Sequence, residues 1–212
     1  MEFTANDFNR ETDVSRETLE RLEAYIALLA KWQKAINLIG SQTLKDVWHR
    51  HVLDSAQLRN LAPPASKNWI DLGSGAGFPG MVLSILGVGD VFLLEKDARK
   101  CVFLREANRI TGSGARIIEG QVEEIVSLDP ESRPFPAPQV ITARAVAPLD
   151  RLLTMARPLC IPDTVCLFPK GQDVERELTV VTKYPNIQVD KLPSCTDPCA
   201  VILCIKGLAN GT

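Results

Sequence analysis

The sequence predicts an α/β fold in which a mostly parallel sheet follows a set of N-terminal helices. From about residue 68 onward, short apolar runs alternate with helical stretches, which is the pattern of strands joined by crossover helices. A glycine-rich turn, residues 73–80, follows the first of these runs. The last two runs are separated only by a turn rich in Pro, Ser and Asp, so we expect them to pair antiparallel.

At 212 residues the chain is long enough for one large domain, or for one domain with an appendage. Its apolar fraction of 45% and charged fraction of 24% are ordinary for a globular protein. Two adjacent prolines, Pro63 and Pro64, separate the helical patterns from the alternating ones. We therefore predict a helical part over residues 1–66 and a sheet domain over residues 67–212.

Two helices are predicted in the first part. Ser15 is placed to cap the first, because acidic residues follow it and apolar residues then recur every three or four positions toward Gly40. The second covers residues 44–61 and is ended by Pro63. Residues 1–14 are polar, and we expect them to lack regular structure.

The second part is predicted to hold seven strands and the helices that connect them. The strands are short apolar runs bounded by Gly, Pro, Asn and Asp, and the helices are longer amphipathic stretches. We expect strands at residues 69–72, 91–95, 115–118, 139–142, 164–168, 187–192 and 200–205, and helices at 79–87, 98–111, 122–126, 149–157 and 172–183.

Charge is unevenly distributed along the chain. The net charge of −2 argues against a wholly basic nucleic-acid binder. Residues 31–60, however, carry five basic and two acidic side chains, and residues 96–116 carry six basic and two acidic. Such local positive faces suit a polyanionic ligand, although solvated helix faces would give the same pattern.

We expect a cytoplasmic monomer that binds neither membrane nor metal. The first residues lack the basic and apolar regions of a signal peptide, and no apolar run approaches roughly 18 residues. The six cysteines are expected to be buried free thiols in a reducing compartment. The only histidines, His49 and His51, do not share a helix face and make a poor metal clamp.

The turn after the first strand has the spacing G-x-G-x-G at Gly73, Gly75 and Gly77. Glycines let a loop take positive φ and let a ligand approach the backbone. A dinucleotide site has G-x-G-x-x-G with an acidic residue about 20 positions on. Here the glycines are packed more closely, and Glu95, at the end of the second strand, is the acidic residue that can accept both hydroxyls of a ribose.

This turn and its acidic partner resemble motifs I and II of class I S-adenosylmethionine-dependent methyltransferases. The resemblance implies a Rossmann-like, seven-stranded, mostly parallel sheet with an antiparallel last strand, and S-adenosyl-L-methionine as cofactor. That cofactor has no pyrophosphate, so a loop shaped for an adenosine and an amino acid fits it better than a dinucleotide. A nicotinamide or flavin enzyme, and a glycine-rich turn without a ligand, remain alternatives.

Further candidate residues lie at the carboxyl ends of the strands, where ligands sit in open α/β sheets. We expect Phe78 to wall the cofactor, Val122 to pack on the adenine ring, and Glu123 to meet its edge unless it only begins a solvated helix. Arg144 and Lys170 follow the fourth and fifth strands. They bring positive charge to the mouth of the site, unless each pairs with a structural acid.

The loop after the fourth strand narrows the chemistry. Methyltransferases acting on exocyclic amines typically carry Asn/Asp-Pro-Pro-Tyr/Phe there, and C5-pyrimidine enzymes a cysteine nucleophile; this chain has Ala-Arg-Ala-Val at residues 143–146. A guanine N7 already offers a lone pair, so holding it in line with the methyl group is sufficient. Arg144 or Lys170 can hydrogen-bond guanine O6 or a phosphate. No catalytic side chain is assigned.

Six segments in order resemble the family of bacterial small-subunit rRNA guanine-N7 methyltransferases (RsmG, also called GidB), over about residues 16–206. The resemblance implies methyl transfer from S-adenosylmethionine to N7 of one guanine in the decoding region of 16S rRNA, met as RNA or as the small ribosomal subunit. By residue match it implies cofactor contacts at Gly73, Phe78, Val122, Glu123 and Arg144. The segments are residues 31–38, 50–55, 70–80, 122–124, 143–145 and 170–171.

Arg50, His51 and Lys170, which lie in these segments, are the candidate RNA contacts. Family members often have Trp-Asn where this chain has Trp32-Gln33, so no role is assigned to Gln33. Two other functions remain open. The glycines with Glu95 would also suit an NAD-dependent oxidoreductase on a Rossmann fold, and the basic segment 96–116 would suit a non-catalytic RNA-binding module.

Overall fold

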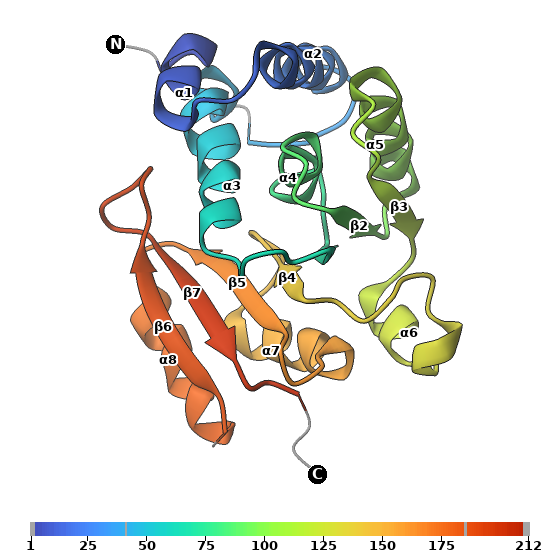
Figure 1. Cartoon of the computed structure of the whole chain (residues 1–212), viewed down its shortest axis with the longest axis vertical. Coiled ribbons are helices and arrows are strands. Elements are labelled where there is room, and N and C mark those ends of the chain that lie inside the picture. The colour runs from blue at the N-terminus through green and yellow to red at the C-terminus, as the bar shows by residue number, and fades with distance from the viewer. Residues whose placement is uncertain (1–2, 41, 185, 210–212) are drawn as a thin grey trace.

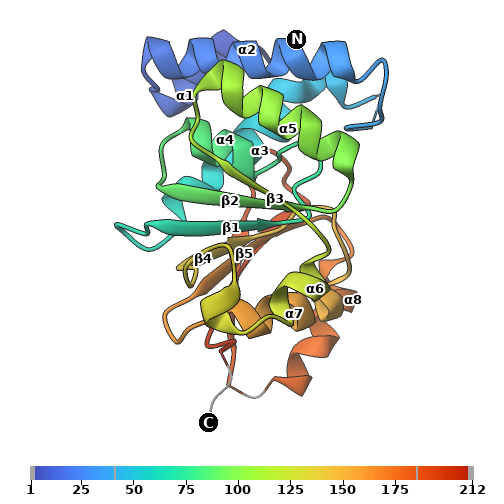
Figure 2. The same cartoon turned by 90° about the vertical axis from the view of Figure 1, so that its right-hand side faces the viewer.

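The computed structural model describes residues 3–40, 42–184 and 186–209. A single seven-stranded sheet runs through the molecule, with helices on both faces (Figures 1 and 2). Its strands are displaced from the predicted ranges by no more than two residues at either end. They are β1 (Asn68–Leu72), β2 (Asp90–Glu95), β3 (Arg116–Glu119), β4 (Val140–Thr142), β5 (Val165–Lys170), β6 (Gln188–Pro193) and β7 (Val201–Lys206).

The strand order is β3-β2-β1-β4-β5-β7-β6. The strands from β3 to β5 pair parallel, whereas β7 pairs antiparallel with both β5 and β6. This confirms the mostly parallel sheet with an antiparallel last strand. The order reverses between β1 and β4, so the carboxyl ends of those strands mark the switch point at which open α/β sheets bind ligands.

Helices cover the two faces unequally (Figure 2). The N-terminal helices lie on one face with α4 and α5, and α6, α7 and α8 lie on the other. The helices of the first face are α1 (Ala5–Thr12), α2 (Arg16–Trp32), α3 (Asp54–Ala56), α4 (Gly80–Ile85) and α5 (Ala98–Thr111); those of the second are α6 (Val122–Val126), α7 (Leu149–Ala156) and α8 (Val174–Leu178).

The first helices differ from the predicted ones in extent. Residues 5–12 form α1, because Thr4 and Asp7 make a reciprocal capping box with each other's backbone N–H groups. The expectation that this segment lacks regular structure was therefore wrong. Ser15 caps α2 as predicted, its hydroxyl accepting the N–H of Thr18.

The helix α2 ends at Trp32 rather than near Gly40. The Gln33 side chain accepts the N–H groups of Leu38 and Ile39 and donates to the Ile39 carbonyl. These bonds fold the chain back on itself, so the apolar spacing continues beyond the helix although the helix does not. Gln33 thus has a structural role that its departure from the family's usual Asn had left open.

The second predicted helix is one helical run of mixed type. It comprises η1 (Leu44–Asp46), η2 (Trp48–Leu53), α3 and η3 (Gln57–Asn60), and it ends before the Pro63-Pro64 pair. The stretch η2 has π-helical bonding. The predicted helix over residues 172–183 is likewise divided, into α8 and a 3-10 turn η6 (Thr179–Lys183).

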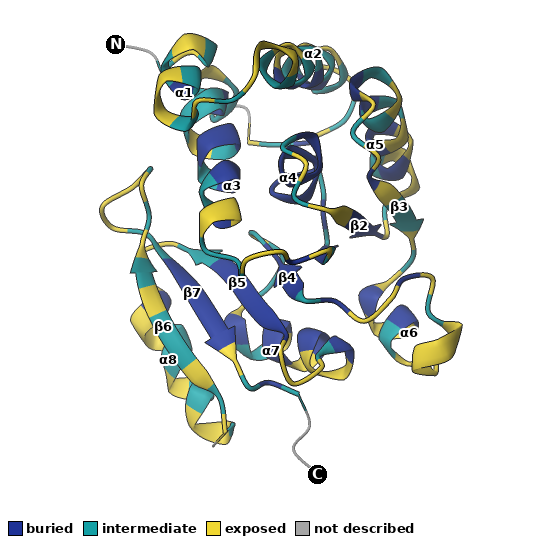
Figure 3. Cartoon of the chain, viewed as in Figure 1, coloured by how far each residue is buried: buried dark blue, intermediate teal, exposed yellow. Residues whose placement is uncertain are grey.

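The sheet separates two apolar cores (Figure 3). Successive residues of β1 alternate between them: Trp69 faces the core under the N-terminal helices, and Ile70 faces the other. Tyr25 and Leu29 of α2 are fully buried in the first core. In α5 the apolar run 102–104 favours an inward position for Val102, but the structure leaves this side chain 50% exposed.

The N-terminal helices share this first core with the sheet, which bears on the predicted parts 1–66 and 67–212. Their outer ends, residues 1–2 and 210–212, lie outside the described residues, as do residues 41 and 185. The division itself stays a prediction. Its sharpest test is whether the two parts unfold together.

Truncating Leu29 to Ala is expected to lower the free energy of unfolding of the whole chain by about 2–5 kcal/mol, because it opens a cavity in the shared core. Urea unfolding followed by tryptophan fluorescence and by far-UV circular dichroism should give one coincident transition. The exposed Val102→Ala is the matched control and should cost about 0.5 kcal/mol or less. Two separate transitions would mean that the N-terminal part folds on its own.

Candidate active site

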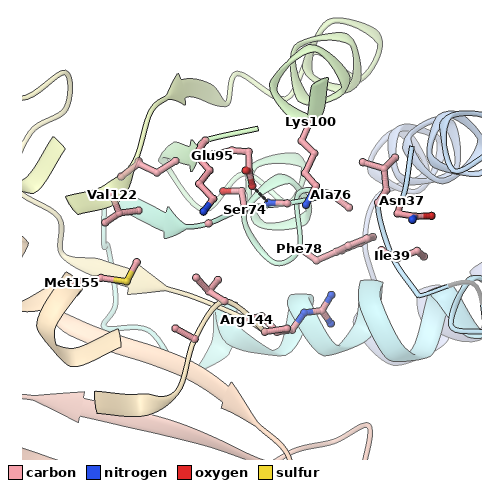
Figure 4. A pocket seen from close by; sticks show the side chains of 18 of the residues that line it. Asn37, Ile39, Ser74, Ala76, Phe78, Glu95, Lys100, Val122, Arg144 and Met155 are labelled. Carbon is pink, nitrogen blue, oxygen red and sulfur yellow. Dashed lines mark hydrogen bonds between the residues drawn. The ribbon is translucent and has the colours of Figure 1, made fainter. Parts of the chain in front are cut away.

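The carboxyl ends of β1, β2 and β4 open into a cavity of about 870 Å³, which we call the first cavity. Its walls come from the glycine turn, the end of β2, the start of α6, the loop after β4, and residues 37–40 and Thr43 of the N-terminal part (Figure 4). The structure brings together every predicted cofactor residue here: Gly73, Gly75, Phe78, Glu95, Val122, Glu123 and Arg144 all line the first cavity. Cofactor contact by each of them stays a prediction.

The glycine turn has a backbone that favours glycine. Gly73 and Gly75 have φ of +62° and +58°, in the left-handed region. A Cβ built on Gly73 would lie 2.9 Å from the side chain of Val146. Gly77 is equally restricted, because a Cβ there would lie 2.9 Å from the Tyr25 hydroxyl. These positions therefore require glycine, and Gly73 and Gly75 line the first cavity with backbone alone.

Two carboxylates hold the turn in place. Glu95 accepts the N–H of Gly75 at 2.7 Å with one oxygen and the N–H of Asp97 at 2.8 Å with the other. Its side chain is buried, yet it lines the first cavity. Each oxygen keeps a further lone pair, so the predicted ribose contact is compatible with this role but is not tested by it.

Asp71 is the second of these carboxylates. It is fully buried and accepts the Thr142 hydroxyl at 2.8 Å and the N–H of Gly80 at 3.3 Å. Burial raises the pKa of Asp71 to about 6, against the hydrogen bonds that favour its charged form. In the sequence, Asp71 is simply the acidic residue that precedes the glycines. In the structure, its carboxylate joins the end of β1 to Thr142 of β4 and to Gly80 at the start of α4.

Arg144 connects the sheet to the N-terminal part. Its guanidinium donates to Asp54 Oδ2 at 2.9 Å, to the Arg50 carbonyl at 2.9 Å and to His51 Nδ1 at 2.6 Å. It also lies 5.3 Å from the centre of the Phe78 ring, within range of a cation–π contact. Pairing with a structural acid, the alternative left open by the sequence, is thus realised, while Arg144 still lines the first cavity.

The bond from Arg144 fixes the state of His51. Arginine only donates, so Nδ1 accepts and the proton of the neutral ring sits on Nε2, which donates to the Thr43 hydroxyl at 2.9 Å. Burial, together with the charges of Arg144 and Arg50, lowers the pKa of His51 to about 3. The ring also stacks on Phe78, with centroids 4.9 Å apart. Both ring nitrogens of His51 are therefore occupied by hydrogen bonds within the protein. RNA contact by His51 stays a prediction.

A second cavity of about 880 Å³ adjoins the first. The two share Thr43, His51 and residues 144–147, so the loop after β4 is their common wall. Ala145 in this wall has φ of +55°, an uncommon conformation for a residue with a Cβ. The predicted RNA contacts Arg50, His51 and Lys170 all line the second cavity.

Lys170 is not a free charge. Its ammonium donates to Glu177 at 2.6 Å and to the Ala147 carbonyl at 3.2 Å, and its side chain is 10% exposed. Glu177 also accepts the N–H of Leu149 at 2.6 Å, which ties α8 to the start of α7. The structural pairing considered for Lys170 is thus present, and Arg50 is the predicted RNA contact with an exposed side chain.

At the other end of the first cavity, Val122 and Glu123 begin α6. Val122 is buried and offers an apolar surface with Met155 beside it (Figure 4). Glu123 accepts from Arg151 at 2.7 Å, and this hydrogen bond lowers the pKa of Glu123. The Glu123 carboxylate therefore favours its charged form and is oriented by Arg151, while its predicted contact with the adenine edge stays a prediction.

Several residues of the site were not anticipated from the sequence. Asn37 and Ile39 reach the first cavity from the N-terminal part, far from any strand end, so no rule based on strand ends would find them. Lys100 enters from the first turn of α5. The segment 31–38 is one of the family-like motifs, which is the one signal that pointed toward Asn37.

The described residues contain no group of three His, Cys, Asp or Glu side chains able to hold a metal. None of the described helices is both long and apolar enough to cross a bilayer.

All six cysteines are free thiols, but Cys195 and Cys199 are exposed rather than buried as expected.

A sheet of this order, with a glycine turn and an acidic strand end facing a cavity at the switch point, defines a class I S-adenosylmethionine-dependent methyltransferase. The chain belongs to the family of rRNA small subunit methyltransferase G (GidB), whose model matches residues 18–201. The family, fold, enzyme class and cofactor expected from the sequence are thereby confirmed.

Individual relatives agree with this assignment. The chain is 47% identical over 198 residues to ribosomal RNA small subunit methyltransferase G of Paramagnetospirillum magneticum, covering 93% of each chain. It is 48% identical over 200 residues to the protein of the same name from Rhodospirillum rubrum, covering 94% of this chain and 96% of that one. An O-methyltransferase from Bacillus cereus, solved with SAH, shares the fold with a TM-score of 0.63 at 12% identity, covering 96% and 98%.

Gly73→Ala is expected to abolish cofactor binding and to destabilise the protein by about 2 kcal/mol or more, because the new Cβ adds a clash with Val146 to left-handed strain. Gly87→Ala is the matched control, since Gly87 has φ of +71° but open space around it. Calorimetric titration with S-adenosylhomocysteine and urea unfolding measure both effects. Equal behaviour of the two variants would contradict the close approach at Gly73.

Asp71→Asn should change the pH dependence of stability. A folded pKa of about 6, above the roughly 3.9 of an unfolded Asp, means that this carboxyl favours the folded state below pH about 4 and loses that contribution as pH rises through 6. Relative to the native protein, the variant should therefore gain up to about 3 kcal/mol between pH 4 and 7. Urea unfolding across that range checks it, with exposed Asp163→Asn as control; a trend no larger than the control's would argue against it.

Proposed function

We propose that this protein methylates N7 of one guanine in 16S rRNA, with the cofactor in the first cavity and the guanine in the second. The observation that carries the proposal is the common wall of the two cavities at residues 144–147, at the switch point of the sheet. A methyl group passed between ligands in the two cavities would be transferred beside these shared residues. Family membership supports ribosomal RNA of the small subunit as the substrate.

The residues of the first cavity fit the cofactor. A Cβ at Gly73 would clash with Val146, so this position takes glycine. Without a side chain there, a ligand in the first cavity can approach the backbone of the turn. Glu95 would accept the ribose hydroxyls, and Val122 with Met155 would give the adenine an apolar surface, because all three line this cavity. Glu123 would lie at the adenine edge. Phe78 and Arg144 close the side toward the second cavity.

Bound S-adenosylmethionine would supply a methyl group that a lone pair can accept directly. A guanine N7 exposes such a pair, so no side chain has to remove a proton, and none in the second cavity is assigned that task. The wall at residues 144–147 has a fixed shape, because Arg144 is held by three acceptors. The contribution of these residues to rate is thus positioning.

Arg50 and Lys170 line the second cavity and are proposed to face the RNA, Arg50 with an exposed charge and Lys170 from its pair with Glu177. We propose that the enzyme acts as a cytoplasmic monomer. The two alternatives are an NAD-dependent oxidoreductase and a non-catalytic RNA-binding module. The family match favours neither.

The test is methylation of small ribosomal subunits, and separately of naked 16S rRNA, from a strain lacking the gene. The native protein should add one N7-methylguanine, seen by nucleoside mass spectrometry, and Gly73→Ala should add none. Supplying both substrates separates free RNA from the assembled particle as the preferred form. An unchanged nucleoside map in both arms, or methylation of another base or atom, would reject the proposal.

A further inference from the structure

Ion pairing in the first cavity leaves two ammonium groups without an assigned partner. Four basic side chains line it: Lys96, Lys100, Arg144 and Arg151. Arg144 pairs with Asp54, and Arg151 pairs with Glu123 at 2.7 Å. Among the described residues, neither the Lys96 nor the Lys100 ammonium group makes a hydrogen bond or an ion pair.

Lys100 is the more deeply placed of the two lysines. Lys96 is exposed, whereas Lys100 is half-buried on the first turn of α5. Figure 4 shows its side chain extending into the first cavity beside Ala76, at the end where Asn37 and Phe78 lie. A half-buried ammonium that points at the backbone of a ligand-binding turn is placed to meet an anion.

The first cavity thus has a chemical order along its length. Val122 and Met155 form an apolar end, the carboxylate of Glu95 lies between, and the ammonium of Lys100 is at the far end (Figure 4). S-adenosylmethionine has a matching order of groups: an apolar adenine, a ribose with two hydroxyls, and an amino acid that ends in a carboxylate. The two orders align in only one direction.

We propose that Lys100 binds the α-carboxylate of the cofactor's amino acid and so fixes which way the cofactor lies in the first cavity. This inference rests on the proposed function, because it takes S-adenosylmethionine as the ligand. Arg144, the other cation near that end, is committed to Asp54, Arg50 and His51. Lys100 lines the first cavity and not the second, so an RNA phosphate in the second cavity is not its partner.

The experiment compares two ligands that differ only in the carboxylate: S-adenosylhomocysteine and its decarboxylated analogue. Calorimetric titration of the full chain should show that Lys100→Met weakens S-adenosylhomocysteine by about 10- to 100-fold, the usual loss for a hydrogen bond to a charged group. The analogue should bind the variant as it binds the native protein. Lys100→Arg, which keeps the charge, should recover most of the affinity.

Lys96→Met is the matched control, since Lys96 also lines the first cavity but is exposed, whereas Lys100 is half-buried. It should affect both ligands by the same factor. Equal losses for both ligands in Lys100→Met would overturn the inference, as would a weakened affinity for 16S rRNA with the ligand preference unchanged. If the native protein binds neither ligand, the proposed function itself fails; if it binds both and only the Lys100 result is negative, the proposed function stands.

Discussion

The guanidinium of Arg144 is the contact on which the arrangement of the site depends. It joins the end of β4 to the helical run of the N-terminal part through Asp54, the Arg50 carbonyl and His51. Arg144 and Asp54 are 16% and 14% exposed in their side chains, so removing either partner would leave a charge poorly solvated. The N-terminal part is thereby held at one position relative to the strand ends.

The same contact orders a chain of donors. Arg144 donates to His51, His51 to Thr43, and the Thr43 hydroxyl to the Gly40 carbonyl at 2.8 Å. Each member has one role because arginine has no acceptor. Gly40 and Thr43, which line one side of the first cavity, are therefore held by hydrogen bonds that lead back to the sheet. The first cavity is complete only when both parts of the chain are present.

Periodicity and strand-end reasoning predicted the sheet, and the candidate cofactor residues they collected all line the first cavity. They failed where a single side chain overrides a pattern. The apolar spacing of α2 continues through Ile36, yet Gln33 folds the chain back after Trp32. The capping box of α1 has Asp at N3, where the usual signature has Glu or Gln, so the sequence pattern does not reveal it. Ion pairs such as Lys170 with Glu177 depend on packing between elements, which no spacing in one segment reveals.

The loop after β4 belongs to both cavities. A substitution anywhere in it changes the shape of both cavities at once, so a slower variant there does not by itself show which cavity is affected. Assigning a cause requires the apparent affinities for cofactor and for nucleic acid from the same preparation. For this enzyme, a substitution at residues 144–147 can be interpreted only when both affinities are measured together.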